Sequence, residues 1–184
     1  MRKGVVQNIQ SFQSHAPQLA QGVYVHASAT LIGQVQIGPD SSIWPGVVIR
    51  GDVNFIQIGA ETNIQELSSL HVNHRSAEDP QGAPLVIGNR VTIGHMVILH
   101  GCKIEDESLI GMGSIVMDKA VVHRHVLLAA GSLVPEGKVL ESGYLYMGRP
   151  AKQVRALTSD EILHLKQSAE MYVRLKQAYL DEPV

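Results

Sequence analysis

Two histidines, His95 and His100, lie close together in the apolar segment 93–102, which reads IGHMVILHGC. Imidazole side chains bind metal ions and transfer protons near neutral pH. The segment is short and rich in β-branched residues, so it predicts a strand and not an amphipathic helix. The spacing also differs from the i, i+4 pair of a helical zinc-protease motif, which is therefore excluded. Two neighbouring histidines can equally be ordinary surface or core residues, so the pattern around them has to decide.

The composition narrows the class of protein. The chain has 184 residues and a formal net charge of −2, which fits one domain spanning residues 1–184. It contains 17 Gly but only two Phe and one Trp, so aliphatic side chains must fill the core. The sequence has no basic stripe, which argues against a nucleic-acid partner. Residues 1–21 have no long apolar run, so neither a signal peptide nor a membrane span is expected, and the single cysteine, Cys102, fits a reducing cytoplasm.

An aliphatic residue recurs every six positions through most of the chain. The clearest series is Ile98, Ile104, Ile110, Val116, Val122, Leu128 and Val134, and a second is Ile37, Ile43, Ile49 and Phe55. A sustained six-residue period is typical of a parallel β-helix built from hexapeptides. Each hexapeptide supplies a short strand and a corner, and its aliphatic residue points toward the axis. Three hexapeptides form one triangular coil, and coils stack about 4.8 Å apart.

Three segments depart from this repeat. Residues 1–22 are polar and mixed, and predict an extended arm before a β-helix at 23–150. Residues at about 72–86 are polar and contain two prolines, and predict a loop that is either inert or functional. The repeat fades after Pro135, and residues 143–150 predict a turn-rich exit. A capping box at Thr158 and Glu161, followed by helical spacing, predicts an amphipathic helix within 158–181.

The repeat also relates three histidines to one another. With the loop excised, Leu70-His71 and Leu99-His100 have the same phase, so His71 and His100 are expected on one face, one coil apart. His95 falls on the preceding face, and one chain cannot easily bring all three imidazoles together. Two chains of a cyclic oligomer can, if the neighbour provides His95. Three imidazoles with an open fourth position form the pattern of a catalytic zinc site, and Fe²⁺ or Co²⁺ also suits them.

Several short motifs together resemble a known family. They are Ile49-Arg50-Gly51-Asp52, Thr62-Asn63-Ile64-Gln65-Glu66, Leu70-His71, Gly94-His95, Leu99-His100-Gly101 and Gly148-Arg149-Pro150-Ala151-Lys152. Over nearly its whole length the sequence resembles the γ-class carbonic anhydrases, especially their small bacterial hexapeptide members. The resemblance implies an all-β, left-handed parallel β-helix with a C-terminal α-helix. It also implies a homotrimer whose subunit interfaces bind Zn²⁺, with Fe²⁺ or Co²⁺ as alternatives, and hydrate CO₂ to bicarbonate through a metal-bound hydroxide.

The resemblance assigns a metal-binding role to His71, His95 and His100. It further implies that Asn63 and Gln65 hydrogen-bond near the metal-bound water or the substrate. Glu66 stands where well-studied members carry Asp.

Two roles are possible for each of three further residues. Arg50 and Asp52 are implied to form an ion pair across the trimer interface, and a solvated surface pair is the alternative. Tyr172 matches a helix tyrosine that approaches the metal, and simple core packing is its alternative.

The proton-transfer positions depart from the family pattern. The acidic shuttle residues of well-studied members correspond to Val53 and His74. His74 can relay protons because its ordinary pKa lies near neutrality, but the loss of both carboxylates predicts slow or absent turnover. Two other functions stay open: an acyl-CoA transferase or thioesterase, which would bind CoA without needing a metal, and a metal-binding protein without catalytic activity.

Overall fold

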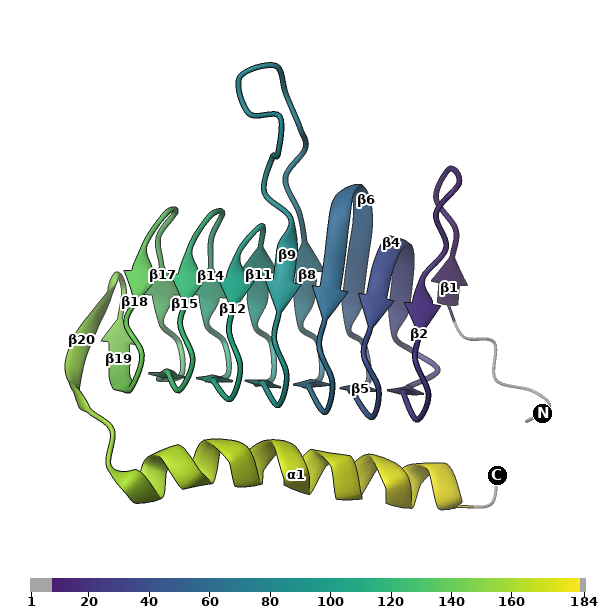
Figure 1. Cartoon of the computed structure of the whole chain (residues 1–184). Coiled ribbons are helices and arrows are strands. Elements are labelled where there is room, and N and C mark those ends of the chain that lie inside the picture. Colours follow the sequence, from purple (N-terminus) through teal and green to yellow (C-terminus); the bar gives the residue numbers. More distant parts are fainter. Residues whose placement is uncertain (1–7, 183–184) are drawn as a thin grey trace.

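A computed structural model describes residues 8–182 of the chain. Short strands wind into a parallel β-helix with three faces, and one long helix runs along its length (Figure 1). The predicted fold class, a hexapeptide β-helix with a C-terminal helix, is confirmed. None of the helical structure within residues 8–182 is long and apolar enough to cross a membrane.

Each face of the β-helix is a stack of strands. The histidine face, which carries His71 and His100, consists of β1 (Asn8–Gln10), the first parts of β4 (Thr30–Ile37) and β6 (Val48–Ile58), β8 (Ser69–His71), β11 (Ile98–His100), β14 (Ile115–Val116) and β17 (Leu133–Val134). The open face consists of β2 (Gln18–Leu19), the later parts of β4 and β6, β9 (Leu85–Ile87), β12 (Lys103–Ile104), β15 (Val121–Val122) and β18 (Val139–Leu140). The helix face consists of β3 (Tyr24–Val25), β5 (Ser42–Ile43), β7 (Asn63–Ile64), β10 (Thr92–Ile93), β13 (Leu109–Ile110), β16 (Leu127–Leu128), β19 (Tyr144–Gly148) and β20 (Ala151–Ala156).

The six-residue step fills the axis of the β-helix with aliphatic side chains. The series from Ile104 to Val134 is buried at every member, as the repeat predicts. The step continues to Leu140 and Tyr146, which are also buried, so the prediction that the repeat fades after Pro135 is wrong. The predicted turn-rich exit at 143–150 has turns at both ends but is wrong for residues 144–148, because Tyr146 completes a further coil in β19, which pairs with β16 and β20.

Two members of the predicted series have the wrong phase. Ile98 is 44% exposed, whereas Leu99 is fully buried, so the step from Leu99 to Ile104 is one residue shorter than the repeat. Phe55 is only half-buried, and Ile56 takes the inward position instead. Here β6 continues from one face onto the next, and this long strand shifts the phase of the hexapeptide.

The segment expected to be an extended arm is partly built into the β-helix. Strands β1 and β2 pair in parallel with β4, and Ile9 packs against the hydrophobic core. The prediction for residues 1–22 is therefore wrong for these strands, which extend two sheet faces by one strand each. Residues 1–7 lie outside the described part of the chain.

The predicted loop leaves the β-helix between β8 and β9 and projects from a corner (Figure 1). Its two arms meet at the base, where Asn73 N donates to Ala83 O at 2.9 Å and Ala83 N donates to Asn73 O at 3.3 Å. The loop ends at Pro84, slightly earlier than expected, because β9 begins at Leu85.

The C-terminal helix α1 (Ser159–Asp181) covers the helix face and contacts β5, β7 and β10. It begins with the predicted capping box, in which Thr158 Oγ1 accepts from Glu161 N and Glu161 Oε2 accepts from Thr158 N. Near the other end of α1, Lys176 Nζ donates to Gly22 O and Asp40 Oδ1, both at 2.7 Å. The helix is therefore tied to the first coils and shields the outer side of β7 and β10.

Candidate metal centre

His71 and His100 face each other on neighbouring strands. They are register partners in β8 and β11, as the hexapeptide phase predicts. His71 Nδ1 lies 3.1 Å from His100 Nε2. The loop that interrupts the sequence between them leaves this stacking intact, because it starts after His71 and returns to the next face of the same coil.

A carboxylate holds the second nitrogen of each ring. His71 Nε2 lies 3.1 Å from Asp52 Oδ1, and His100 Nδ1 contacts Asp118 Oδ1. The four side chains thus form a row, from Asp52 through the two imidazoles to Asp118. Metal-ligating histidines commonly use the second ring nitrogen in this way, which fixes the ring and its tautomer.

The row contains one more hydrogen-bonding contact than two neutral imidazole rings can satisfy. It contains three contacts between hydrogen-bonding atoms, whereas two neutral rings supply two N–H groups. A proton or a metal cation must therefore occupy the remaining contact. Burial lowers the pKa of His71, although the hydrogen bond to Asp52 opposes this shift, so an extra proton on this ring is disfavoured at neutral pH.

The separation of the two inner nitrogens also fits a metal. Two imidazole nitrogens on one tetrahedral zinc, each at roughly 2.0–2.1 Å, lie about 3.3 Å apart. The observed distance between His71 Nδ1 and His100 Nε2 is 3.1 Å. The donor set of the row therefore suits a zinc-class cation held by these two nitrogens.

His95 lies on the edge of the β-helix, away from this row. It belongs to a turn at the corner between β10 and β11, so the prediction that it falls on the preceding face is wrong. His95 Nδ1 lies 2.6 Å from Glu66 Oε2, in the stacked turn of the previous coil. Its Nε2 has no hydrogen-bond partner among residues 8–182. Within residues 8–182 of one chain, no three His, Cys, Asp or Glu side chains come together to hold a metal ion.

Asn63 and Gln65 form a buried polar network beneath α1. Gln65 Nε2 donates to Asn63 Oδ1 at 3.0 Å, and Asn63 Nδ2 donates to Thr92 Oγ1 at 3.1 Å. The Thr92 hydroxyl in turn lies 3.1 Å from that of Ser168 in the helix. The network fixes the carboxamide of Gln65 next to the corner that carries Glu66.

Tyr172 of α1 lies between the core and the corner that carries Glu66. Its ring packs edge-on against Trp44, with centroids 5.6 Å apart, which is the packing role considered above. Burial, and then the nearby charge of Glu66, raise the pKa of the Tyr172 hydroxyl. The same side chain is thus close enough to Glu66 to feel its charge.

Arg50 and Asp52, expected to pair across an interface, form an ion pair within this chain at 2.5 Å. Partial burial raises the pKa of Asp52, but hydrogen bonds from Arg50 and His71 outweigh it and hold the pKa below its ordinary value. Asp52 is therefore ionised at neutral pH and oriented by both neighbours. Arg50 remains 44% exposed at its side chain.

His74 and Asp118 lie at the base of the loop. His74 is exposed to solvent. It directly follows Asn73 and lies close in sequence to Val72 and His71. Asp118 was missed by the sequence analysis. It lies in the turn that follows β14, the strand next to β11, and only the stacking of the coils brings it to His100.

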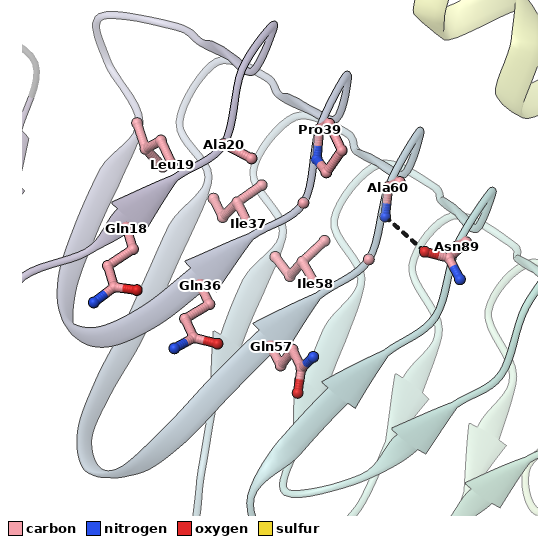
Figure 2. A pocket seen from close by; sticks show the side chains of 12 residues that line it. Gln18, Leu19, Ala20, Gln36, Ile37, Pro39, Gln57, Ile58, Ala60 and Asn89 are labelled. Atoms are coloured by element: carbon pink, nitrogen blue, oxygen red, sulfur yellow. Dashed lines mark hydrogen bonds between the residues drawn. The ribbon is translucent and has the colours of Figure 1, made fainter.

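A separate groove of about 470 Å³ lies on the open face at the N-terminal end (Figure 2). Three glutamines, Gln18, Gln36 and Gln57, stack along it in register. Asn89 closes one end, where its Oδ1 accepts from Ala60 N at 2.9 Å. None of its lining residues is titratable, so this groove offers no acid, base or nucleophile.

Comparison with known proteins agrees with this architecture. Residues 16–51 match the family "Bacterial transferase hexapeptide (six repeats)". The solved structure of a hexapeptide transferase family protein from Anaplasma phagocytophilum has a TM-score of 0.87 and 42% identity, over 94% of this chain and 98% of that one. The fold and the repeat thus define a hexapeptide-repeat protein.

Two curated relatives narrow the class further. Protein YrdA of Escherichia coli is 51% identical over 90% of both chains. A carbonic anhydrase of Geobacillus kaustophilus is 42% identical over 93% of this chain and 90% of its own length. The chain therefore belongs to the γ-class carbonic anhydrase family.

Proposed function

We propose that this protein is a metal-dependent carbonate dehydratase that works as a homotrimer and interconverts CO₂ and bicarbonate. The observation that carries the proposal is the row Asp52–His71–His100–Asp118, in which carboxylates hold the outer nitrogens of the two rings and the inner nitrogens lie at a metal-compatible distance. His71 and His100 of one chain and His95 of the neighbour hold the metal, which we take to be Zn²⁺, with Fe²⁺ or Co²⁺ as the alternatives.

The three histidines share one local arrangement, which supports a common role. In each, one ring nitrogen contacts a carboxylate: Asp52 for His71, Glu66 for His95 and Asp118 for His100. The opposite nitrogens of His71 and His100 face each other 3.1 Å apart, and we assign the opposite nitrogen of His95 to the metal of the neighbouring chain. Such carboxylate–histidine pairs raise the basicity of the ligand and hold the ring in place.

An exposed apolar surface beside the histidines supports the trimer. Its largest members on the histidine face and at the corner of His95 are Val48, Ile98 and Met117, and Leu67, Met96 and Met112. The corner members are stacked, since Met96 N donates to Glu66 O and Gly113 N to His95 O. Exposed apolar side chains gathered on one side of a protein often mark an interface. We propose that a second copy covers it and brings its own His95 to the row.

A bound zinc-class cation supplies a Lewis acid that lowers the pKa of water to about 7, so that hydroxide is available for attack on CO₂. We assign two tasks to the residues of the chain: they orient the substrate, and they exchange protons with solvent. We assign Gln65, held by Asn63, to orient a substrate oxygen, and Glu66 and Tyr172 to the polar edge of the site. His74 exchanges protons with solvent, and Arg50 with Asp52 supports the interface. The single, buried thiol of Cys102 supports a cytoplasmic location.

Chelation tests the proposal. Treatment with a strong chelator should abolish CO₂ hydration, and return of Zn²⁺ should restore it at about one metal per chain, because a trimer has three equivalent interfaces. Elemental analysis and a stopped-flow hydration assay measure both quantities. Metal-free protein from cells grown with ample zinc and iron, or activity that survives chelation, would contradict the proposal.

Replacing His74 tests the proton route. His74→Ala should lower kcat by up to about 10²-fold, at the lower end for loss of a proton-transfer group, and leave the metal content unchanged. Imidazole buffer should restore much of the rate by carrying protons from outside. Loss of metal in this variant would mean that His74 is a ligand, and a rate insensitive to imidazole would mean that proton transfer does not limit turnover.

Acyl-CoA chemistry is the alternative suggested by the transferase names of similar proteins. It predicts CoA binding that needs no metal. A metal-binding protein without catalysis would retain zinc but hydrate no CO₂. The chelation assay, run alongside calorimetric titration with acetyl-CoA, separates the three outcomes.

A further inference from the structure

Asp118 joins two parts of the molecule that are distant in sequence. Its Oδ1 contacts His100 Nδ1, and its Oδ2 accepts from Asn73 Nδ2 at 3.0 Å. Asn73 stands at the base of the loop, immediately before His74. One carboxylate therefore touches both a proposed metal ligand and the loop that leaves the β-helix beside it. Its side chain is only 17% exposed, which strengthens both contacts relative to a surface pair.

The base of the loop is a built structure. Asn54, which is 4% exposed, donates through Nδ2 to Asn73 O at 3.1 Å and to Gln81 O at 2.9 Å. Together with the pairing of Asn73 and Ala83, these bonds hold the two arms of the loop side by side. The next residue, Lys119, reaches farther along the loop and forms an ion pair with Asp79 at 2.7 Å. The turn at Asp118 and Lys119 thus contacts the loop at two residues, Asn73 and Asp79.

The space for this carboxylate depends on Gly101. Gly101 has a φ of +51°, a conformation that side chains with a Cβ rarely adopt. A Cβ placed there would collide with Asp118 Oδ1 and with Ala83, at the other end of the loop. The glycine directly after His100 therefore lets the ligand strand, the loop and Asp118 meet at one place.

We propose that Asp118 is a positioning residue that ties the loop at residues 72–84 to the ring of His100, so that loop order and metal binding stabilise each other. The inference rests on the proposed metal site. Asp118 holds the N–H of His100 Nδ1 and thereby leaves Nε2 to bind the metal. Because Asp118 also accepts from Asn73, a ring fixed by metal fixes the loop base, and an ordered loop fixes the ring. Such coupling is reciprocal by thermodynamic linkage.

Hydrogen exchange on metal-free protein tests the link by itself. Asp118→Ala and Asn73→Ala should each speed amide exchange within residues 72–84. Asp106→Ala is the matched control, because Asp106 also bridges two coils, through Asn89 N at 2.8 Å, but on a different corner. Unchanged exchange in both test variants, or an equal change in the control, would overturn the link, whether or not the protein binds metal.

Zinc affinity and zinc-induced protection test the coupling. Asp118→Ala should weaken Zn²⁺ binding roughly 10–100-fold in a chelator competition, and Asn73→Ala by less. Saturating Zn²⁺ should slow loop exchange in the wild type but not in Asp118→Ala. Wild-type affinity in Asp118→Ala, or equal protection by zinc in both proteins, would overturn the coupling.

Two further results keep the interpretation clear. If Asp118→Ala fails to fold, Asp118→Asn keeps the shape of the side chain but can accept only one of the two hydrogen bonds, so an intermediate loss is expected. If the wild type binds no zinc, the proposed function and the coupling both fail, while the metal-free exchange data still decide whether Asp118 holds the loop.

Discussion

Replacing any one of His71, His95 or His100 with alanine is expected to lower the rate of CO₂ hydration by at least about 10³-fold, because water is no longer acidified to a pKa near 7. Metal content should fall in parallel, since two imidazoles remain at each site. The two measurements are elemental analysis and the initial rate of CO₂ hydration. Equal losses at all three positions are the essential result, because His95 does not adjoin the other two within one chain.

His123→Ala provides a matched control. His123 Nδ1 lies 3.0 Å from Glu105 Oε2, an arrangement like that of His95 with Glu66, but on another corner of the β-helix. Its loss should leave metal content and rate near wild type. Full activity in His95→Ala, with activity lost in His71→Ala, would contradict a site shared between chains.

Mixing two inactive variants is expected to restore activity if each site draws on two chains. In a trimer that contains both His95→Ala and His71→Ala chains, one of the three interfaces combines an intact His71–His100 pair with an intact His95. Random mixing produces mixed trimers about three-quarters of the time, so about a quarter of the sites should regain metal and activity. Co-expression with two different affinity tags isolates the mixed trimers, in which about a third of the sites should be active.

The control for this experiment pairs His71→Ala with His100→Ala. Both residues lie on the same side of the proposed interface, because they are register partners in β8 and β11 of one chain. No combination of these two chains completes a site, and the mixture should stay inactive. Inactivity of the first mixture, with mixed trimers demonstrated, would refute the shared site. Recovery in the control would refute the assignment of His71 and His100 to one chain.

The six-residue period determined much of this structure. In a β-helix each coil contacts only its neighbours, so a local repeat sets the register directly. The placement of His71 opposite His100 followed from counting hexapeptides across the loop, and the structure has the same pairing. The capping box of α1 was equally visible, because Thr158 and Glu161 satisfy each other's backbone within one turn.

The predicted phase of the hexapeptide repeat is wrong where the six-residue period itself changes. Ile98 and Leu99 are both aliphatic, so composition cannot tell which of them points inward. A corner shortened by one residue at Gly101 decides in favour of Leu99. Likewise, His95 sits in the corner turn that stacks on Glu66, and only the stacked backbone reveals that it faces the edge of the β-helix.

The carboxylate partners of the histidines were decided by tertiary structure alone. Asp52 and Asp118 come from the coils on either side of the histidine pair, 19 residues before His71 and 18 residues after His100. No local pattern marks an aspartate as the partner of an imidazole in another coil. Which residues stack could be predicted from the six-residue repeat, because stacking follows a repeat. Which polar atoms meet around the stacked histidines depends on the exact lengths of corners and loops, and these are settled only when the coils close on one another.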